Sequence, residues 1–135
     1  MEYKNILTTC VYCGTGCGLN LQMLDGRIVG VLPAKGHPVS DGRLCVKGWN
    51  AAGFVYNPER LTTPLVRRNG MLIEASWDEA LSLVAGKLSA IQAESGPRSI
   101  GVFASAKCTN EDNYVLQKLA RAVLKTNNVD HCARL

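Results

Sequence analysis

Four of the six cysteines have a spacing that could hold an inorganic cofactor. Cys10, Cys13 and Cys17 follow a C-x2-C-x3-C pattern, and Cys45 comes after 27 intervening residues. A cubane 4Fe–4S cluster needs one thiolate at each of its four irons. Three closely spaced cysteines on one loop can reach three corners, and a distant fourth can complete the set. The same loop carries three glycines, Gly14, Gly16 and Gly18. They suit a chain that must turn tightly around a bulky group.

Structural zinc is the main alternative for these cysteines, because Zn²⁺ also takes four thiolates in a tetrahedron. Zinc modules more often pair two C-x2-C segments, and the three-plus-one spacing departs from that pattern. A disulfide framework is disfavoured, because the segment from Met1 to Cys10 has no apolar run typical of a secretory signal. The cytosol keeps thiols reduced. The spacing therefore favours the cluster and leaves zinc open.

Lys47 lies two residues after Cys45. Its ammonium could offset the charge of the thiolates and polarise a path toward a neighbouring redox centre. By composition alone a solvated surface lysine is the more common case.

Two further cysteines and two histidines complete the candidates. Cys108 and Cys132 do not join the cluster by spacing, and we expect them to be small, buried side chains. His37 lies in a Gly/Pro-containing loop and is expected to be exposed. His131 stands at the carboxyl end of an expected strand, where α/β proteins bind ligands, although a lone histidine there is more often structural.

Composition limits the class of protein. The 135 residues have 47% hydrophobic and 19% charged side chains, as in a globular chain. The 15 Lys and Arg against 11 Asp and Glu give a net charge of +4. This surplus is too small to favour nucleic acid or an anionic membrane as a partner. No apolar run approaches the roughly 20 residues of a membrane span. We expect a soluble cytoplasmic protein.

The first part of the chain reads as a small β-rich module, residues 1–58. Residues 3–9 are β-prone and lead directly into the cysteine loop. Two apolar runs, 19–23 and 27–32, are joined at Asp25-Gly26, a strong hairpin signal. Residues 48–56 are expected to form a short helix that stops before Pro58.

A helical pattern follows a second expected hairpin. Residues 65–68 and 71–75 flank Asn69-Gly70. Ser76-Trp77-Asp78-Glu79 is then a capping box, in which the serine accepts the N3 amide and Glu79 reaches back. Apolar residues recur behind it at helical spacing until Gly96-Pro97 stops the pattern. We expect this stripe to face a core.

The remaining residues predict the start of an α/β domain. Residues 99–105 are typical of a buried strand, and a second helix is expected from Thr109 or Asn110 to about Asn127. A short last strand would complete a strand–helix–strand unit of a parallel sheet. The predicted fold class is α/β (α+β overall): a 4Fe–4S module at 1–58, then an incomplete α/β domain at 59–135.

Several motifs together resemble a known family. The cysteine pattern at 10–17 and Gly-Arg-Leu-Cys-Val-Lys-Gly at 42–48 resemble the N-terminal cluster domain of molybdenum/tungsten bis-pterin guanine dinucleotide oxidoreductases. Leu-Val-Arg-Arg at 65–68 and Ser-Trp-Asp-Glu-Ala at 76–80 match the next landmark of that family. The stretch 105–135, with its motifs at 105–111 and 127–135, resembles the cytoplasmic formate dehydrogenase catalytic chain, especially the multi-subunit type.

The resemblance implies a role for particular residues. It makes Cys10, Cys13, Cys17 and Cys45 the ligands of a 4Fe–4S cluster, and it makes Lys47 the residue between the cluster and a pterin. In the family the residue after Cys-Ala-Arg-Leu is the cysteine or selenocysteine that ligates the metal. That position would be 136, so no catalytic residue is expected within the 135 residues, and the chain alone is expected to be inactive. We hypothesise that a selenocysteine codon was read as a stop, or that the chain was divided there.

The expected activity is the interconversion of formate and CO2 at a Mo or W bis-molybdopterin guanine dinucleotide centre, bound mostly by residues beyond 135. The expected partners are the remainder of the catalytic subunit and iron–sulfur, flavin or hydrogenase electron-transfer subunits. Other bis-pterin oxidoreductases such as a nitrate reductase, a non-catalytic electron-transfer subunit, and a zinc-stabilised module are the alternatives. The sequence does not choose between Mo and W, cysteine and selenocysteine at 136, or NAD(P), ferredoxin and hydrogenase as acceptor.

Overall fold

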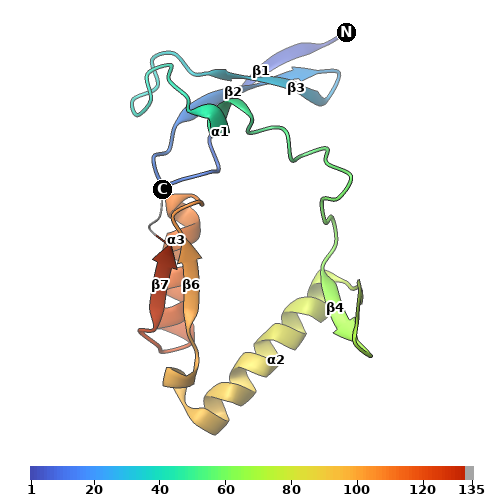
Figure 1. Ribbon diagram of the computed structural model, residues 1–135, viewed down its shortest axis with the longest axis vertical. Coiled ribbons are helices and arrows are strands. Elements are labelled where there is room, and N and C mark those ends of the chain that lie inside the picture. The colour runs from blue at the N-terminus through green and yellow to red at the C-terminus, as the bar shows by residue number, and fades with distance from the viewer. Residues whose placement is uncertain (133–135) are drawn as a thin grey trace. The chain divides into compact units, whose positions relative to one another are not determined.

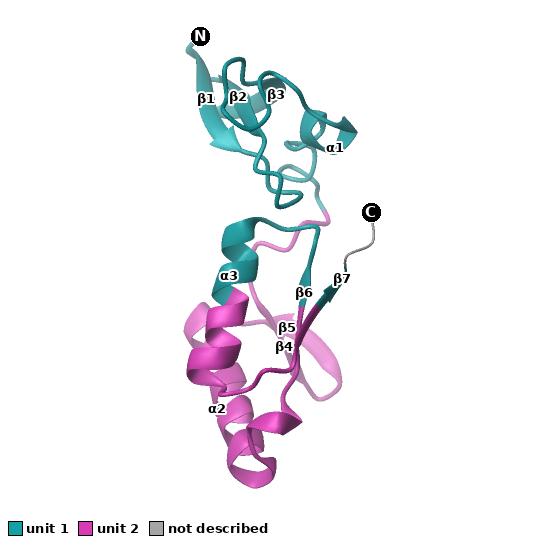
Figure 2. Ribbon diagram, turned by 90° about the vertical axis from the view of Figure 1, so that its left-hand side faces the viewer, with its two compact units in different colours: residues 1–58, 104–115, 131–135 teal, residues 59–103, 116–130 magenta. Residues whose placement is uncertain are grey.

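The computed structural model describes residues 1–132 (Figure 1). It contains two compact units (Figure 2). Unit 1 comprises residues 1–58 and 104–115, together with His131 and Cys132. Unit 2 comprises residues 59–103 and 116–130. Helices and strands both occur, as the predicted fold class requires.

Unit 1 is built on a three-stranded antiparallel sheet. Its strands are β1 (Tyr3–Thr9), β2 (Gly18–Leu24) and β3 (Arg27–Pro33), in that order across the sheet. The β2–β3 hairpin turns at Asp25 and Gly26, whose φ angles are 45° and 80°. Two positive φ angles give a turn whose twist matches that of the flanking strands. The predicted strand and hairpin are confirmed.

The small core of unit 1 lies directly beside the cysteine loop. Its buried side chains are Cys10, Leu19, Val31 and Ala51. Partly buried Cys17 and other apolar residues pack against this cluster. A cysteine of the predicted ligand set is therefore part of the core, and the sheet fixes the position of the loop that begins there.

The helix predicted at 48–56 is shorter and starts earlier. Helix α1 spans Val46–Trp49, and turns follow it. The Asn50 side chain donates to Val46 O at 2.8 Å, and Gly53 N donates to Asn50 O at 3.0 Å. These side-chain and turn hydrogen bonds form where further helical hydrogen bonds would be needed to continue the helix. The glycine at 53 also disfavours helical backbone because of its conformational entropy.

Unit 2 begins with the second predicted hairpin and the long helix. Strands β4 (Leu65–Arg68) and β5 (Met71–Glu74) pair antiparallel around Asn69-Gly70, with φ angles of 49° and 84°. Helix α2 spans Trp77–Ser95 and ends at Gly96, where φ is 77°. Both elements confirm the sequence prediction.

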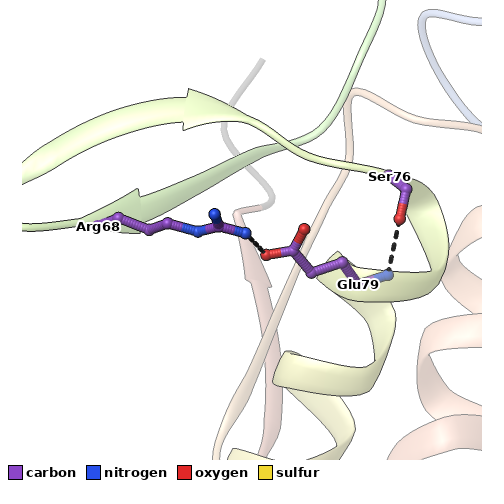
Figure 3. A network of polar contacts seen from close by, with 3 residues as sticks. All are labelled: Arg68, Ser76 and Glu79. Carbon is purple, nitrogen blue, oxygen red and sulfur yellow. Dashed lines mark hydrogen bonds and ion pairs between the residues drawn. The ribbon is translucent and has the colours of Figure 1, made fainter.

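The start of α2 departs from the predicted capping box in one respect (Figure 3). Ser76 Oγ accepts the backbone N–H of Glu79 at 3.1 Å, as expected. The Glu79 carboxylate, predicted to reach back to Ser76, is directed to the Arg68 guanidinium of β4. A cation on the preceding hairpin offers the carboxylate a stronger partner than a neutral amide does. This pair fastens the hairpin to the first turn of the helix.

The last elements form a strand–helix–strand unit. Strand β6 (Val102–Ser105) precedes α3 (Asn110–Lys118), a π-helical turn at Leu119–Val123, and β7 (Val129–Cys132). The two strands pair, with Val102 N donating to Asn128 O at 2.8 Å. Their arrows run in the same direction in Figure 1, as predicted for a parallel sheet. The predicted strand at 99–105 is shortened by a 3₁₀ turn at Pro97–Ser99.

The apolar helix stripe predicted to face a core is largely exposed. Within the described residues no side chain of α2 is buried, and Leu81 and Val84 are 59% and 54% exposed. Phe103 of β6 is 86% exposed. The predicted core face of α2 is therefore not buried within the described residues. No helix within residues 1–132 is long and apolar enough to cross a membrane.

Candidate functional site

The cysteine loop is the connection between β1 and β2. Thr9 pairs with Gly18 at the end of the ladder, and Cys10 N donates to Cys17 O at 2.8 Å. This bond closes the loop at its base. Gly16 takes a φ of 70° inside it, a conformation that favours glycine. Three of the predicted ligands thus lie on one short loop whose ends the sheet holds together.

A second loop delivers the fourth cysteine. Ala34 N donates to Gly18 O at 3.1 Å, and Gly18 N donates to buried Ser40 Oγ at 3.1 Å. Gly42 N then donates to Ala34 O at 3.0 Å. Gly18 is the residue after Cys17, so these bonds anchor the 34–42 loop beside the first three cysteines. The chain leaves the loop and reaches Cys45 just before α1.

The four predicted cysteines line one cavity of about 120 Å³. Sequence positions 10–17 and 45 therefore meet in space, as the spacing predicted. The cavity is also lined by Tyr12, Leu44, Lys47, Gly48, Ala106 and Lys107. Apart from the two lysines, its wall is mostly apolar or sulfur.

The four thiols differ in how their surroundings affect ionisation. Burial, and then the neighbouring thiols of Cys10, Cys13 and Cys45, raise the pKa of Cys17. Hydrogen bonding by Thr15, whose Oγ1 lies 3.3 Å from Cys13 Sγ, lowers the pKa of Cys13. Backbone N–H groups of Gly48 and Lys47, at the start of α1, lower the pKa of Cys45. Because thiolates are the form that binds iron or zinc, these contacts favour metal binding at Cys13 and Cys45.

The donor set fits an iron–sulfur cluster. Within residues 1–132 no three His, Cys, Asp or Glu side chains gather around the position of a single metal ion. The four cysteines instead line one cavity together. A cubane core carries one iron behind each thiolate, so four cysteines that line one cavity match the number of ligands that it needs. The mostly apolar wall fits a group whose potential depends on burial and on hydrogen bonds to sulfur.

Lys47 lies where the sequence predicted a charge beside the cysteines. It lines the cysteine cavity and also a neighbouring cavity of about 460 Å³. Tyr12, Val46, Asn50 and Lys107 line the larger cavity with it. Its positive charge is one of the causes that lower the pKa of Cys13 and of Cys45. Lys47 therefore borders both spaces.

A second segment, which sequence analysis did not identify, also reaches this site. Lys107 lines both cavities, and Asn110 Nδ2 donates to Gly14 O at 2.8 Å. Asn110 and Gly14 are 96 positions apart, so no local spacing could indicate the contact. A Cβ added at Gly14 would lie 2.5 Å from Asn110 Oδ1, so the close approach depends on glycine.

The other sequence candidates do not line the cysteine cavity or lie outside the described residues. Cys108 is partly buried, with Sγ 2.9 Å from Ser105 O. Cys132, predicted to be buried, is exposed at the end of β7. His131 is also exposed on that strand, and the motif residues 133–135 lie outside the described residues.

His37 is not the exposed loop histidine that the sequence predicted. It is half-buried, and a Cβ added at Gly18 would overlap its imidazole ring. The ring therefore covers the glycine that joins the two cysteine-bearing loops. The ring packs on Gly18, and its Nδ1 accepts the backbone N–H of Val39 at 3.4 Å.

Substitution Gly18→Ala is expected to lower the iron content of the protein, because the added methyl group displaces His37 and the loop anchored on Gly18. Overpacking of this kind costs about 1–3 kcal/mol. The measurement is iron per chain in the whole gene product isolated without oxygen. The double variant Gly18→Ala/His37→Ala should recover iron. Gly30→Ala is the matched control, since its Cβ meets only the Gln22 side chain, whose terminal Oε1 is the one atom that must move. Equal iron in Gly18→Ala and Gly30→Ala would contradict this prediction.

Comparison with known protein families gives two matches that follow one another along the chain. The family model "Molybdopterin oxidoreductase Fe4S4 domain" matches residues 3–57. The model "Molybdopterin oxidoreductase" matches residues 60–135. The first match contains all four cysteines that line the cavity, and the second contains α2, α3 and the parallel strands.

Curated relatives align over nearly the whole chain. The "F420-dependent formate dehydrogenase 1 subunit alpha" of Methanococcus maripaludis is 58% identical over 135 residues, which is 100% of this chain and 19% of that protein. The corresponding alpha subunit of Methanocaldococcus jannaschii is 50% identical with the same coverage. A putative formate dehydrogenase of Bacillus subtilis is 46% identical over 97% of this chain and 13% of its own length. The chain thus spans less than a fifth of these relatives.

One solved structure has a similar fold. Acetylene hydratase from Pelobacter acetylenicus superimposes with a TM-score of 0.73 at 26% identity, over 95% of this chain and 18% of that one. Both family models match, and together they place a 4Fe–4S cluster and a molybdopterin among the cofactors of the family. The chain belongs to the molybdopterin oxidoreductase family.

Proposed function

We propose that this chain is the N-terminal, cluster-carrying part of a formate dehydrogenase catalytic subunit. The reaction would be HCOO⁻ → CO2 + H⁺ + 2 e⁻, at a Mo or W bis-molybdopterin guanine dinucleotide centre. The single observation that carries the proposal is that Cys10, Cys13, Cys17 and Cys45 line one cavity. Identities of 50–58% to alpha subunits named as formate dehydrogenases support the substrate.

The four cysteines are proposed as the ligands of a 4Fe–4S cluster. When bound, such a cluster takes up and releases one electron at a time. The chain's own part is to hold four thiolates at fixed places and to exclude water with apolar neighbours. Thr15 beside Cys13, and the backbone amides after Cys45, supply hydrogen bonds toward sulfur. Such bonds tune the potential of a cluster.

Lys47 is proposed as the residue between the cluster and the pterin. Its place at the border of the two cavities supports this role. An ammonium there would offset the negative charge of four thiolates and would bind the polar edge of a pterin in the larger cavity. Its flexible stem suits a point charge that adjusts to its neighbour.

We propose residues 1–58 as the cluster domain and 59–135 as the beginning of the α/β domain. The break between the two family matches, at 57 and 60, supports this boundary. The segment 104–115 belongs to the same compact unit as residues 1–58. We propose that the α/β domain contributes this segment to the wall of the cluster site.

We also propose that the residue at position 136, a cysteine or selenocysteine, ligates the metal. The metal would be Mo or W in the guanine dinucleotide form of the cofactor, and the protein would be cytoplasmic and act with electron-transfer partners. The designation "subunit alpha" of the first relatives supports the presence of further subunits.

The proposal is tested by formate oxidation with the whole gene product and the subunits that copurify with it. Under anaerobic conditions, formate should reduce a one-electron dye such as benzyl viologen, with two dye molecules reduced for each formate. Reduction of nitrate without oxidation of formate would replace the proposal by the nitrate reductase alternative. Hydration of acetylene without net electron transfer would assign the protein the activity for which its structural neighbour, acetylene hydratase, is named. A protein that accepts electrons only from a second, formate-oxidising chain would be an electron-transfer subunit.

A further inference from the structure

A second lysine borders the cysteine cavity from a distant part of the sequence. Lys107 lines the cavity of about 120 Å³ that contains the four cysteines, and also the neighbouring one of about 460 Å³. It shares both cavities with Lys47 and Tyr12. The site is therefore bordered by two cations that come from different elements, one at α1 and one after β6.

The turn that carries Lys107 is held by local hydrogen bonds. Lys107 N donates to Ser105 Oγ at 3.0 Å. Ser105 O is 2.9 Å from Cys108 Sγ and accepts from Asn113 Nδ2 at 3.1 Å. Three bonds thus converge on Ser105, the last residue of β6. They fix the backbone from which the Lys107 side chain extends.

A contact within unit 1 fastens this turn to the cysteine loop. Asn110 Nδ2 donates to Gly14 O at 2.8 Å, and Gly14 lies between Cys13 and Cys17. The approach is so close that a Cβ at Gly14 would meet Asn110 Oδ1 at 2.5 Å. The position of Lys107 beside the thiols is therefore set by a specific amide–carbonyl bond and by a glycine.

We propose that Lys107, held by Asn110 on Gly14, is a second cation that raises the reduction potential of the cluster. The inference rests on the proposed cluster at the four cysteines. One-electron reduction by a low-potential donor adds one negative charge, and no proton is taken up at Lys107. A fixed positive charge stabilises the reduced form relative to the oxidised form. Lys107 is a positioning and tuning residue and touches no reacting substrate.

The test is an anaerobic redox titration of the whole gene product, with dithionite as reductant and the EPR signal of the reduced cluster as readout. Lys107→Gln should raise the oxidised-to-reduced ratio at the wild-type midpoint about tenfold, which is a fall of about 59 mV for one electron. Lys107→Arg should stay within about twofold of wild type, because the charge remains.

A control for the change in net charge is Lys4→Gln. Lys4 is a residue of β1, six positions before Cys10, and its side chain pairs with Glu2. At about 3.3 Å per strand residue it lies roughly 20 Å from Cys10. That distance exceeds the Debye length of about 8–10 Å. Lys4→Gln should leave the midpoint unchanged. A fall in Lys4→Gln equal to that in Lys107→Gln would overturn the proposal.

The outcomes separate this inference from the proposed function. If the wild-type protein gives no reduced-cluster signal, the cluster proposal itself fails. If wild type gives the signal and Lys107→Gln keeps the wild-type midpoint, only the role of Lys107 fails. If Lys107→Gln carries no cluster, Asn110→Ala provides the second measurement, since it releases the turn and keeps the lysine. A fall in the Asn110→Ala midpoint supports the proposal, and an unchanged midpoint overturns it.

Discussion

Replacing Cys45 by serine is expected to remove the cluster from the protein. Cys45 lines the same cavity as the other three cysteines, so serine would leave one iron of the proposed cluster without a thiolate. A serine hydroxyl does not ionise near neutral pH as a thiol in this position can. We expect iron bound through these cysteines to fall from about four atoms per chain to less than about one. Iron analysis and the broad thiolate–iron absorbance near about 400 nm measure the loss.

The matched control for this variant is Cys108→Ser. Cys108 is partly buried, and its Sγ lies 2.9 Å from Ser105 O, a contact that a serine hydroxyl can also make. It does not line the cysteine cavity. Cys108→Ser should keep full iron and absorbance. Wild-type iron in Cys45→Ser, or an equal loss in both variants, would remove Cys45 from the ligand set. Zinc in place of iron in the native protein would favour the zinc alternative.

The second large effect is expected for Lys47→Gln. Lys47 borders both cavities, so loss of its charge would alter the proposed path between the cluster and the pterin. Outer residues of metal sites typically contribute about 10–100-fold to activity. We expect formate-driven reduction of the cluster to slow by about that factor, while iron content stays at the wild-type level. Stopped-flow absorbance after mixing with formate gives the rate.

Lys47→Arg distinguishes charge from shape at this position. Arginine keeps the positive charge but spreads it over a planar group, so we expect only partial recovery of the rate. Both Lys47→Gln and Lys107→Gln remove a cation that lines the cysteine cavity, so both should lower the midpoint potential, and only Lys47→Gln, at the proposed path to the pterin, should also slow reduction by formate. A Lys47→Gln protein that is reduced by formate at the wild-type rate would show that the lysine has no part in electron transfer.

The elements that could be predicted from sequence depend on neighbouring residues. Asp25-Gly26 and Asn69-Gly70 set their own turns through two positive φ angles, which few other residue pairs tolerate. Ser76 caps α2 through the amide three residues ahead. The convergence of four cysteines could also be predicted, because their types and spacing suit one cofactor.

The features missed by sequence analysis depend on contacts between distant segments. The Glu79 carboxylate binds Arg68 of a preceding hairpin, and His37 packs on Gly18. Lys107 reaches the site through the bond of Asn110 to Gly14. None of these contacts has a periodic or local signature. The helix predicted at 48–56 shortened to Val46–Trp49 because side-chain and turn hydrogen bonds competed with the helical ones.

The fold of this chain leaves its reaction open. Acetylene hydratase has a similar fold over nearly all of the chain, and formate dehydrogenase alpha subunits are similar to it in sequence. Substrate choice must therefore depend on residues that bind the substrate, which a shared fold does not specify. In the proposed function, the cysteine cavity would hold the cluster that removes the two electrons of formate oxidation one at a time.

The most direct test of the account is EPR spectroscopy of the whole gene product, frozen shortly after formate is added without oxygen. We expect formate alone to produce the signal of a reduced 4Fe–4S cluster, and we expect that signal to be absent in Cys45→Ser. This result would join the four cysteines to formate oxidation in one measurement. A wild-type protein in which dithionite produces the signal and formate does not would contradict the assignment as a formate dehydrogenase. A signal that persists in Cys45→Ser would contradict the assignment of the ligands.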